Sequence, residues 1–300
     1  EDYIANLLIA NTHTYLLCFS STGKVYWLKV YQLPQAGRNS RGRPINNLLQ
    51  LDSDEVISAM LSVKSFDSSD DSSQYIFMAT KKGTVKKTDL ALFSRPRQGG
   101  IRAVELDDDD ALIGVALTNG SQDVMLFSNS GKAIRFAEEN VRPMGRTARG
   151  VRGMRLKEGQ FIISLMIVDS ESDMSQVLLA TQNGYGKRTK VDDFRKIGRG
   201  GQGVQAIITS GRNGNAVSAA SISDNDEIML ITSGGVMVRT PASEVSCLSR
   251  YAQGVKLINI GSGNVLVGAE QIKEIMQNDD NNDDLESNKE DKEDNEPGES

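Results

Sequence analysis

The sequence has very few of the residues that most often carry out proton transfer, bind metals or form disulfides. His13 is the only histidine, and Cys18 and Cys247 are the only cysteines, in 300 residues. One histidine cannot build a His relay or a His-rich metal site, and no Cys or His spacing matches a zinc site. The two cysteines are too isolated for a disulfide framework, which favours a reducing cytoplasm. We therefore expect no catalytic group in this chain.

Cofactor and membrane signals are missing as well. No apolar run is long enough to cross a bilayer, and the start has no signal-peptide pattern. Residues 198–203 formally match G-x-G-x-x-G, but they do not separate a strand from a helix, and four equivalent loops lack the match. The acidic clusters lie in turns with Ser and Asn, which is typical of solvated loops. We expect no cofactor and no metal in this chain.

What the sequence does contain is one unit that occurs five times. Its clearest copy, residues 177–189, is an apolar strand, a polar turn ending in Asn183-Gly184, and a return strand carrying Lys187 and Arg188. Asn-Gly between such runs predicts a β-hairpin, because the turn needs a positive φ. The turn glycines of the five copies are Gly23, Gly83, Gly131, Gly184 and Gly235.

Three further features recur in phase with the turn glycine. A hydroxyl residue lies three positions before it, and a cation lies four positions after it in every copy except the first, which has Trp27. A loop rich in Arg and Gly then ends in a glycine, 17 to 19 residues after the turn, that is closely followed by an apolar residue. The turn glycines are separated by 60, 48, 53 and 51 residues. A period near fifty with several short strands is typical of a propeller-type array.

We therefore predict an all-β body at residues 1–272, a propeller-like ring of four-stranded blades of about fifty residues. No sustained 3.6-residue periodicity occurs before Lys273. An apolar strand at residues 3–10 has no hairpin before it, and another at residues 264–272 has none after it. The chain therefore reads as a fragment that begins and ends part-way through a unit, as ring-closing arrays do.

The net charge of −6 hides two regions of opposite sign. Residues 273–300 hold 12 acidic and 3 basic residues, which leaves 28 acidic and 31 basic residues in the body. The body is thus mildly basic. The tail has too little apolar content to order itself, and we predict that it is disordered.

Equivalent positions of a ring lie on equivalent surfaces, so the repeated cations are expected to form a basic belt. Glycines beside them let a backbone approach a phosphate closely. The acidic turns recur at a different phase, so we expect opposite charges to lie on different faces. The predicted DNA-binding residues are Arg38, Arg41, Arg43, Lys86, Lys87, Arg95, Arg97, Arg135, Arg146, Arg149, Arg152, Lys187, Arg188, Arg195, Lys196, Arg199, Arg239 and Arg250.

Four segments resemble the C-terminal domain of the bacterial DNA gyrase A protein: residues 42–49, 77–88, 150–153 and 183–189. The likeness runs over essentially all of residues 1–272. It implies a six-bladed β-pinwheel, whose blades exchange strands and whose basic rim wraps double-stranded DNA in a positive sense with little sequence preference. It also implies a place in an ATP-driven type IIA topoisomerase of two A and two B subunits, in the bacterial cytoplasm and on the chromosome. ATP and Mg²⁺ would belong to that holoenzyme.

Two departures from the family pattern limit what the resemblance implies. The gyrase-A box, Q-[KR]-R-G-G-[KR]-G, has no full match, and residues 199–203 come nearest. We expect the box to lie in the missing first blade, with the five Arg-Gly loops as its degenerate counterparts. The DNA-cleaving tyrosine of the family belongs to an upstream domain, so no tyrosine here is assigned that role.

Three alternatives remain at the level of sequence. The nearest is the equivalent domain of the topoisomerase IV A protein, which often has fewer blades or no intact box. A protein-interaction propeller of the WD-repeat kind is less favoured, because Trp27 is followed by Leu28 and no Trp-Asp pair occurs. An enzyme in its own right is disfavoured by the missing catalytic groups.

Overall fold

The computed structural model describes residues 10–36, 42–66, 74–169 and 176–272. Over these ranges every named strand pairs antiparallel, and the only helices are 3-10 turns of three or four residues. The prediction of an all-β body is confirmed for this part of the chain. The acidic tail and the apolar stretch at residues 3–9 lie outside the described ranges.

The five hairpins form where the repeat predicts them. Their turn glycines have φ between +74° and +87°, as the turn chemistry requires. The recurring hydroxyl residue is buried in all five and bonds to the backbone of the residue four positions later, as Thr232 does with Val236 at 3.1 Å. The hydroxyl thus closes the turn. The hairpins are β1 (Tyr15–Ser20) with β2 (Lys24–Lys29), β4 (Tyr75–Thr80) with β5 (Thr84–Asp89), β8 (Asp123–Ser128) with β9 (Lys132–Ala137), β12 (Gln176–Thr181) with β13 (Tyr185–Lys190), and β16 (Glu227–Thr232) with β17 (Met237–Pro241).

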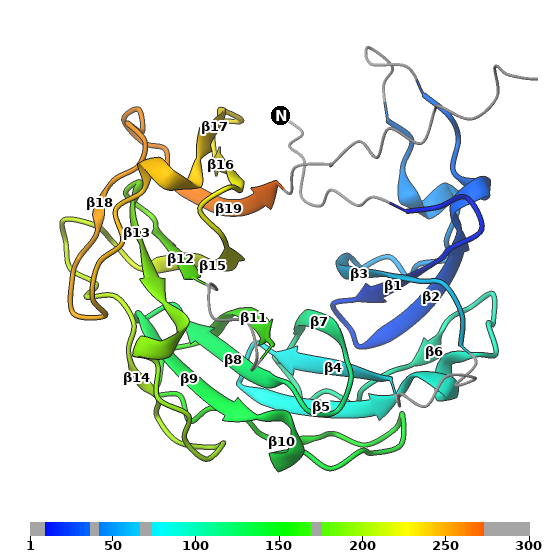
Figure 1. The fold of residues 1–300 in the computed structure, drawn as a ribbon. Helices are drawn as coiled ribbons and strands as arrows, with labels where there is room; N and C mark the ends of the chain where they lie inside the picture. Colours follow the sequence, from blue (N-terminus) through cyan, green and yellow to red (C-terminus); the bar gives the residue numbers. More distant parts are fainter. Residues whose placement is uncertain (1–9, 37–41, 67–73, 170–175, 273–300) are drawn as a thin grey trace, which may run out of the picture.

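Each hairpin gains an inner strand from the residues that follow it. The inner strand pairs with the first strand of the hairpin, and successive inner strands contact one another in chain order. Figure 1 shows them lining the inside of an arc of five blades. The inner strands are β3 (Ile57–Val63), β7 (Leu112–Thr118), β11 (Ile162–Val168), β15 (Ala216–Ile222) and β19 (Leu266–Ile272).

The fourth strand of each complete blade comes from the next unit. The short strand that follows the β4–β5 hairpin pairs with β2 of the unit before it, and the same exchange occurs at three further blades. This confirms the strand exchange that the resemblance implied. The fifth sheet, in the order β17-β16-β19, has three strands. The exchanged strands are β6 (Ile101–Arg102), β10 (Val151–Arg152), β14 (Val204–Gln205) and β18 (Val255–Lys256).

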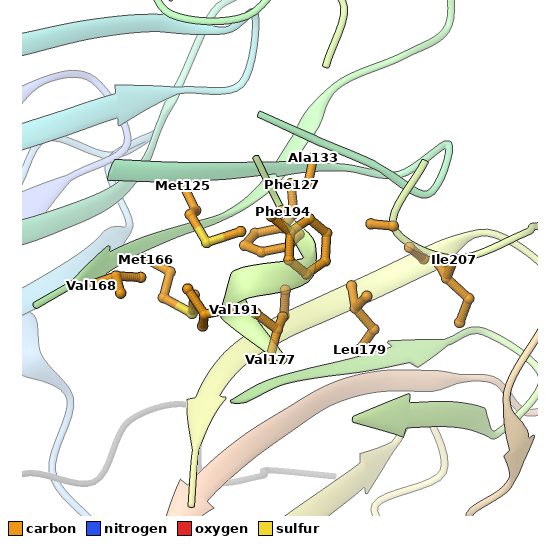
Figure 2. Close-up of a cluster of buried hydrophobic side chains, with 13 residues drawn as sticks. Met125, Phe127, Ala133, Met166, Val168, Val177, Leu179, Val191, Phe194 and Ile207 are labelled. Atoms are coloured by element: carbon orange, nitrogen blue, oxygen red, sulfur yellow. The ribbon is translucent and has the colours of Figure 1, made fainter. Parts of the chain in front are cut away.

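The apolar core lies between blades. In the cluster of Figure 2, Phe127 of the third hairpin contacts Phe194 edge-on, with ring centroids 6.2 Å apart. Leu179 of the fourth hairpin packs on the same cluster, as does Ile207, which follows the exchanged strand β14. The third and fourth blades therefore bury apolar side chains against each other, as neighbours do in other repeat arrays.

The strand exchange also requires glycine at the hairpin turns. The carbonyl of Gly184 accepts hydrogen bonds from the amides of Leu257, at 2.8 Å, and Ile258, at 3.3 Å. A Cβ atom at Gly184 would lie 2.6 Å from the Ile258 oxygen. The carbonyls of Gly23, Gly83 and Gly131 each accept a pair of amides in the same way. Glycine is thus needed for its positive φ and for the close approach of the exchanged segment.

We expect Gly184→Ala to destabilise the protein more than Gly159→Ala. Gly159 has a similar φ, +74° against +77°, but has nothing within 4 Å of a Cβ position. The positive φ should cost about 1–2 kcal/mol in each variant, and the displaced segment should add about 1–3 kcal/mol at Gly184. Denaturant unfolding of both variants measures the difference. Equal losses would show that the exchanged segment does not constrain the turn.

Candidate nucleic-acid interface

The Arg-Gly loops lie at the outer edge of the arc. Each runs into one of the exchanged strands β6, β10, β14 and β18, which Figure 1 shows along the perimeter. The glycine that ends each of these loops has a φ between +70° and +106°. In the first unit the corresponding segment instead forms a 3-10 turn at Ile45–Asn47. We call the four loops with their strands, residues 94–102, 142–152, 195–205 and 248–256, the basic perimeter.

Most predicted loop cations are available to solvent. Within the described ranges, eight of them have no acidic side chain within ion-pair distance. Arg38 and Arg41 lie outside the described residues. The eight, which are exposed or, for Arg146 and Arg250, half-buried, are Arg43, Arg95, Arg97, Arg146, Arg152, Arg195, Arg199 and Arg250.

Hydrogen bonds join neighbouring loops of the basic perimeter. The guanidinium of Arg199 donates to the carbonyl of Arg152 at 3.1 Å, and that of Arg250 donates to the carbonyl of Gln205 at 3.0 Å. Both donors lie four residues before a loop glycine, and both acceptors lie two residues after the preceding one. These bonds connect the loops 142–152, 195–205 and 248–256 into one surface.

Two cations of the exchanged strands were not predicted from the sequence. Arg102 and Lys256 are exposed, and they occupy the same position of an exchanged strand as Arg152. All three lie two residues after a loop glycine, so the repeat phase carries a signal that could have found them. Arg142, at the start of its loop, and Arg155, just after β10, are further exposed cations that were not predicted.

The hairpin cations do not lie on the surface, which corrects the expectation that they form part of the belt. Lys86 and Lys187 are at most 1% exposed, Lys87 is 4% and Arg188 is 6% exposed. The side chain of Arg135 is 12% exposed. Only Arg239, in the last hairpin, is largely exposed, and it pairs with Glu227.

The buried cations connect one blade to the next. The residue four positions after the turn glycine donates to a carbonyl in or beside the 3-10 turn of the following unit. Trp27 occupies this position in the first hairpin, and its indole N–H supplies the same kind of donor. The pairs are Trp27 Nε1 with Phe93 O at 2.9 Å, Lys87 Nζ with Glu138 O at 3.4 Å, Arg135 Nη1 with Val191 O at 3.1 Å, and Arg188 Nε with Val245 O at 2.7 Å.

Acidic side chains offset these charges locally. Asp123, whose side chain is 1% exposed, lies 2.9 Å from Arg135 and 2.7 Å from Lys196. Arg149 pairs at 2.6 Å with Asp107, a member of the acidic run 107–110. The expected separation of opposite charges by face is therefore wrong at this point, because an acidic turn reaches the basic perimeter.

We expect Arg135→Met to unfold far more easily than Arg239→Met, although both change the same position of the repeat. Removing Arg135 leaves Asp123 buried with a poorer set of partners and Val191 O without its donor, a loss of about 3–5 kcal/mol. Arg239 is exposed and, among the described residues, has only the pair with Glu227 across its own hairpin, so its loss should cost less than about 1 kcal/mol. Urea unfolding compares the two. Matching midpoints would exclude a role for the cation in joining blades.

Neither a candidate metal cluster nor a membrane-spanning helix occurs in the described ranges. They contain no group of three or more His, Cys, Asp or Glu side chains that could hold a metal ion. They also contain no helix long and apolar enough to span a membrane.

The repeat unit matches the model of a known protein family. The model described as "DNA gyrase C-terminal domain, beta-propeller" matches five times, at residues 14–64, 74–119, 122–169, 175–228 and 226–273. Each match begins at or near one hairpin and ends at or near the inner strand that follows it.

Curated relatives agree with this match. The chain is 51% identical over 274 residues to the DNA gyrase A protein of Salmonella typhimurium, covering 91% of the chain and 30% of that protein. Its identity is 46% to the Pseudomonas aeruginosa protein of the same name and 48% to that of Escherichia coli, with 93% of the chain covered in both. It covers 34% and 31% of those two proteins, so it spans about a third of their length.

Solved structures share the fold. A C-terminal domain of DNA topoisomerase IV aligns with a TM-score of 0.78 at 26% identity, over 87% of this chain and 80% of that one. A DNA gyrase A C-terminal domain aligns with a TM-score of 0.75 at 26% identity, over 88% and 84%. Structure alone does not separate these two, whereas the sequence relatives named above are all gyrase A. The chain belongs to the DNA gyrase C-terminal domain family, which has a β-propeller fold.

Proposed function

We propose that this chain binds double-stranded DNA along the basic perimeter and wraps it, as the C-terminal domain of a DNA gyrase A protein. The observation that carries the proposal is the row of exposed cations in the basic perimeter, where Arg102, Arg152 and Lys256 occupy equivalent positions in three of the four complete blades. Family membership supports the same reading.

The geometry suits wrapping better than the reading of a base sequence. Bending a DNA site costs about 1–6 kcal/mol, so the cost must be offset by many phosphate contacts spread along a curved surface. Arginines that recur from blade to blade supply such contacts, and contacts to phosphate carry no direct sequence information. We therefore propose weak sequence preference.

The wider assembly follows from the same proposal. The DNA held by this chain would be presented to the rest of the gyrase A protein and to two B subunits, in an enzyme that introduces negative supercoils with ATP and Mg²⁺ bound outside this chain. Such an enzyme would act on the chromosome in the bacterial cytoplasm. These points rest on the relatives, of which this chain covers about a third.

Wrapping is tested with a nicked circular plasmid. The plasmid is mixed with the 300-residue chain, religated, stripped of protein and examined for a change in linking number across a salt series. We expect a positive shift that disappears as salt rises, because bound phosphates release counterions. Binding without any shift would show that the chain holds DNA without wrapping it.

Removing perimeter cations should weaken the salt dependence of binding. We expect Arg95→Ala with Arg195→Ala to lower the slope of log affinity against log salt by about two, at roughly 0.9 per lost phosphate contact. The matched control is Lys64→Ala with Lys157→Ala, which removes two exposed charges outside the basic perimeter. Fluorescence anisotropy at several salt concentrations gives both slopes. Equal slopes for the two variants would place the DNA elsewhere.

A further inference from the structure

Two lysines occupy the same buried position beneath the basic perimeter. Lys86 and Lys187 each lie three residues after a turn glycine, and both are at most 1% exposed. The other three hairpins have Tyr26, Ile134 and Val238 there. An uncharged side chain therefore satisfies the fold at this position, and the two ammonium groups call for a separate explanation.

Both ammonium groups bind carbonyls of basic loops. Nζ of Lys86 donates to the carbonyl of Ala103 at 2.6 Å and to that of Arg146, in the loop 142–150. Nζ of Lys187 donates to the carbonyl of Ser249 at 2.5 Å, in the loop 248–254. Within the described residues neither lysine has a carboxylate within ion-pair distance. Each charge is thus held by backbone oxygens of a loop that carries exposed or half-buried arginines.

The surroundings of both lysines lower their pKa. Burial lowers the pKa of Lys86 to about 8, and the nearby Arg146 adds to this effect. Burial and then Arg250 lower the pKa of Lys187 to about 8.

Other charged groups near the two lysines do not cancel the lowering of their pKa. Asp193 and the Cys247 thiol oppose the lowering of the pKa of Lys187 but do not outweigh it. Around Lys86, the acidic Glu105 and Asp107 are paired with Arg149, and the adjacent Lys87 is paired with Glu138.

We propose that Lys86 and Lys187 are positioning residues that hold two DNA-contacting loops in shape and take up protons from solvent when DNA binds. This rests on the proposed function, because the anion that favours the charged lysine is the DNA phosphate. A phosphate over Arg146 or Arg250 offsets the positive charge that disfavours the ammonium form. Protonation in turn strengthens the donation to the loop carbonyl, so loop order and DNA binding support each other.

The sign of the pH effect follows directly. At pH 7 both lysines are mostly charged before DNA binds, and at pH 9 they are mostly neutral. DNA raises their pKa, so binding near pH 9 takes up protons and becomes weaker as pH rises. A rise of one to two pKa units on binding corresponds to an affinity loss of about five- to tenfold per lysine between pH 7 and 9. Arginines keep their charge over this range.

The experiment measures affinity for a DNA duplex by fluorescence anisotropy at pH 7 and pH 9, at constant ionic strength. The unmodified 300-residue chain is compared with the variant Lys86→Met/Lys187→Met. The matched control is Ile134→Met, which changes the same repeat position without a titratable group. We expect the unmodified chain and the control to lose at least about fivefold in affinity at pH 9, and the double variant to lose far less. A double variant with the full pH loss would overturn the proposal.

Calorimetry keeps the proposal testable if the double variant does not fold. Titration of the unmodified chain with DNA at pH 8.5, in two buffers of different ionisation enthalpy, gives the number of protons taken up. Uptake of between about half a proton and two protons supports the proposal, and no uptake overturns it. Binding at pH 7 without uptake at pH 8.5 would refute the lysine mechanism alone. Failure to bind at pH 7 in low salt would refute the proposed function with it.

Discussion

The structure depends on one backbone interaction, the acceptance of two successive amides from the next unit by the carbonyl of a turn glycine. At Gly184 the amides of Leu257 and Ile258 fill this role, and three other turns repeat it. The contact fixes the exchanged strand on the outer edge of the hairpin and so fixes where the preceding Arg-Gly loop ends. The glycine is required twice over, which explains why the turn is the most regular feature of the sequence.

The same exchange decides which cations can meet a polyanion. Each Arg-Gly loop of the basic perimeter leads into a strand on the outer edge of the preceding blade, so the loop lies at the perimeter (Figure 1). Arg152 and Arg199 are exposed to solvent there. A cation inside a hairpin instead faces the neighbouring blade. It is useful there as a donor to carbonyls, because buried polar groups need partners. Trp27 at the equivalent position supports this view, since an indole shares the N–H of a cation but not its charge.

The repeat predicted much of this from sequence alone. The phase of glycine, hydroxyl and apolar residues located all five hairpins, and the strand exchange followed from the family resemblance. The burial of Lys86 and Arg188 could not be predicted, because a cation in an alternating strand reads the same whether it faces water or the next blade. That distinction depends on contacts between residues about sixty positions apart, such as Arg188 with Val245. The ion pair between Arg149 and Asp107 escaped prediction for the same reason.

The strand exchange also sets the order in which the blades are completed during synthesis. A hairpin gains its fourth strand only from the unit that follows it in the chain, as β2 gains β6. When the chain leaves the ribosome, the outer edge of each hairpin that gains such a strand stays unpaired until about 65 more residues have emerged, as from Lys190 at the end of β13 to Lys256 at the end of β18. At a synthesis rate of about 5–20 residues per second this delay lasts several seconds. Completion of the sheets therefore runs one blade behind synthesis, and an exposed strand edge is present throughout that time.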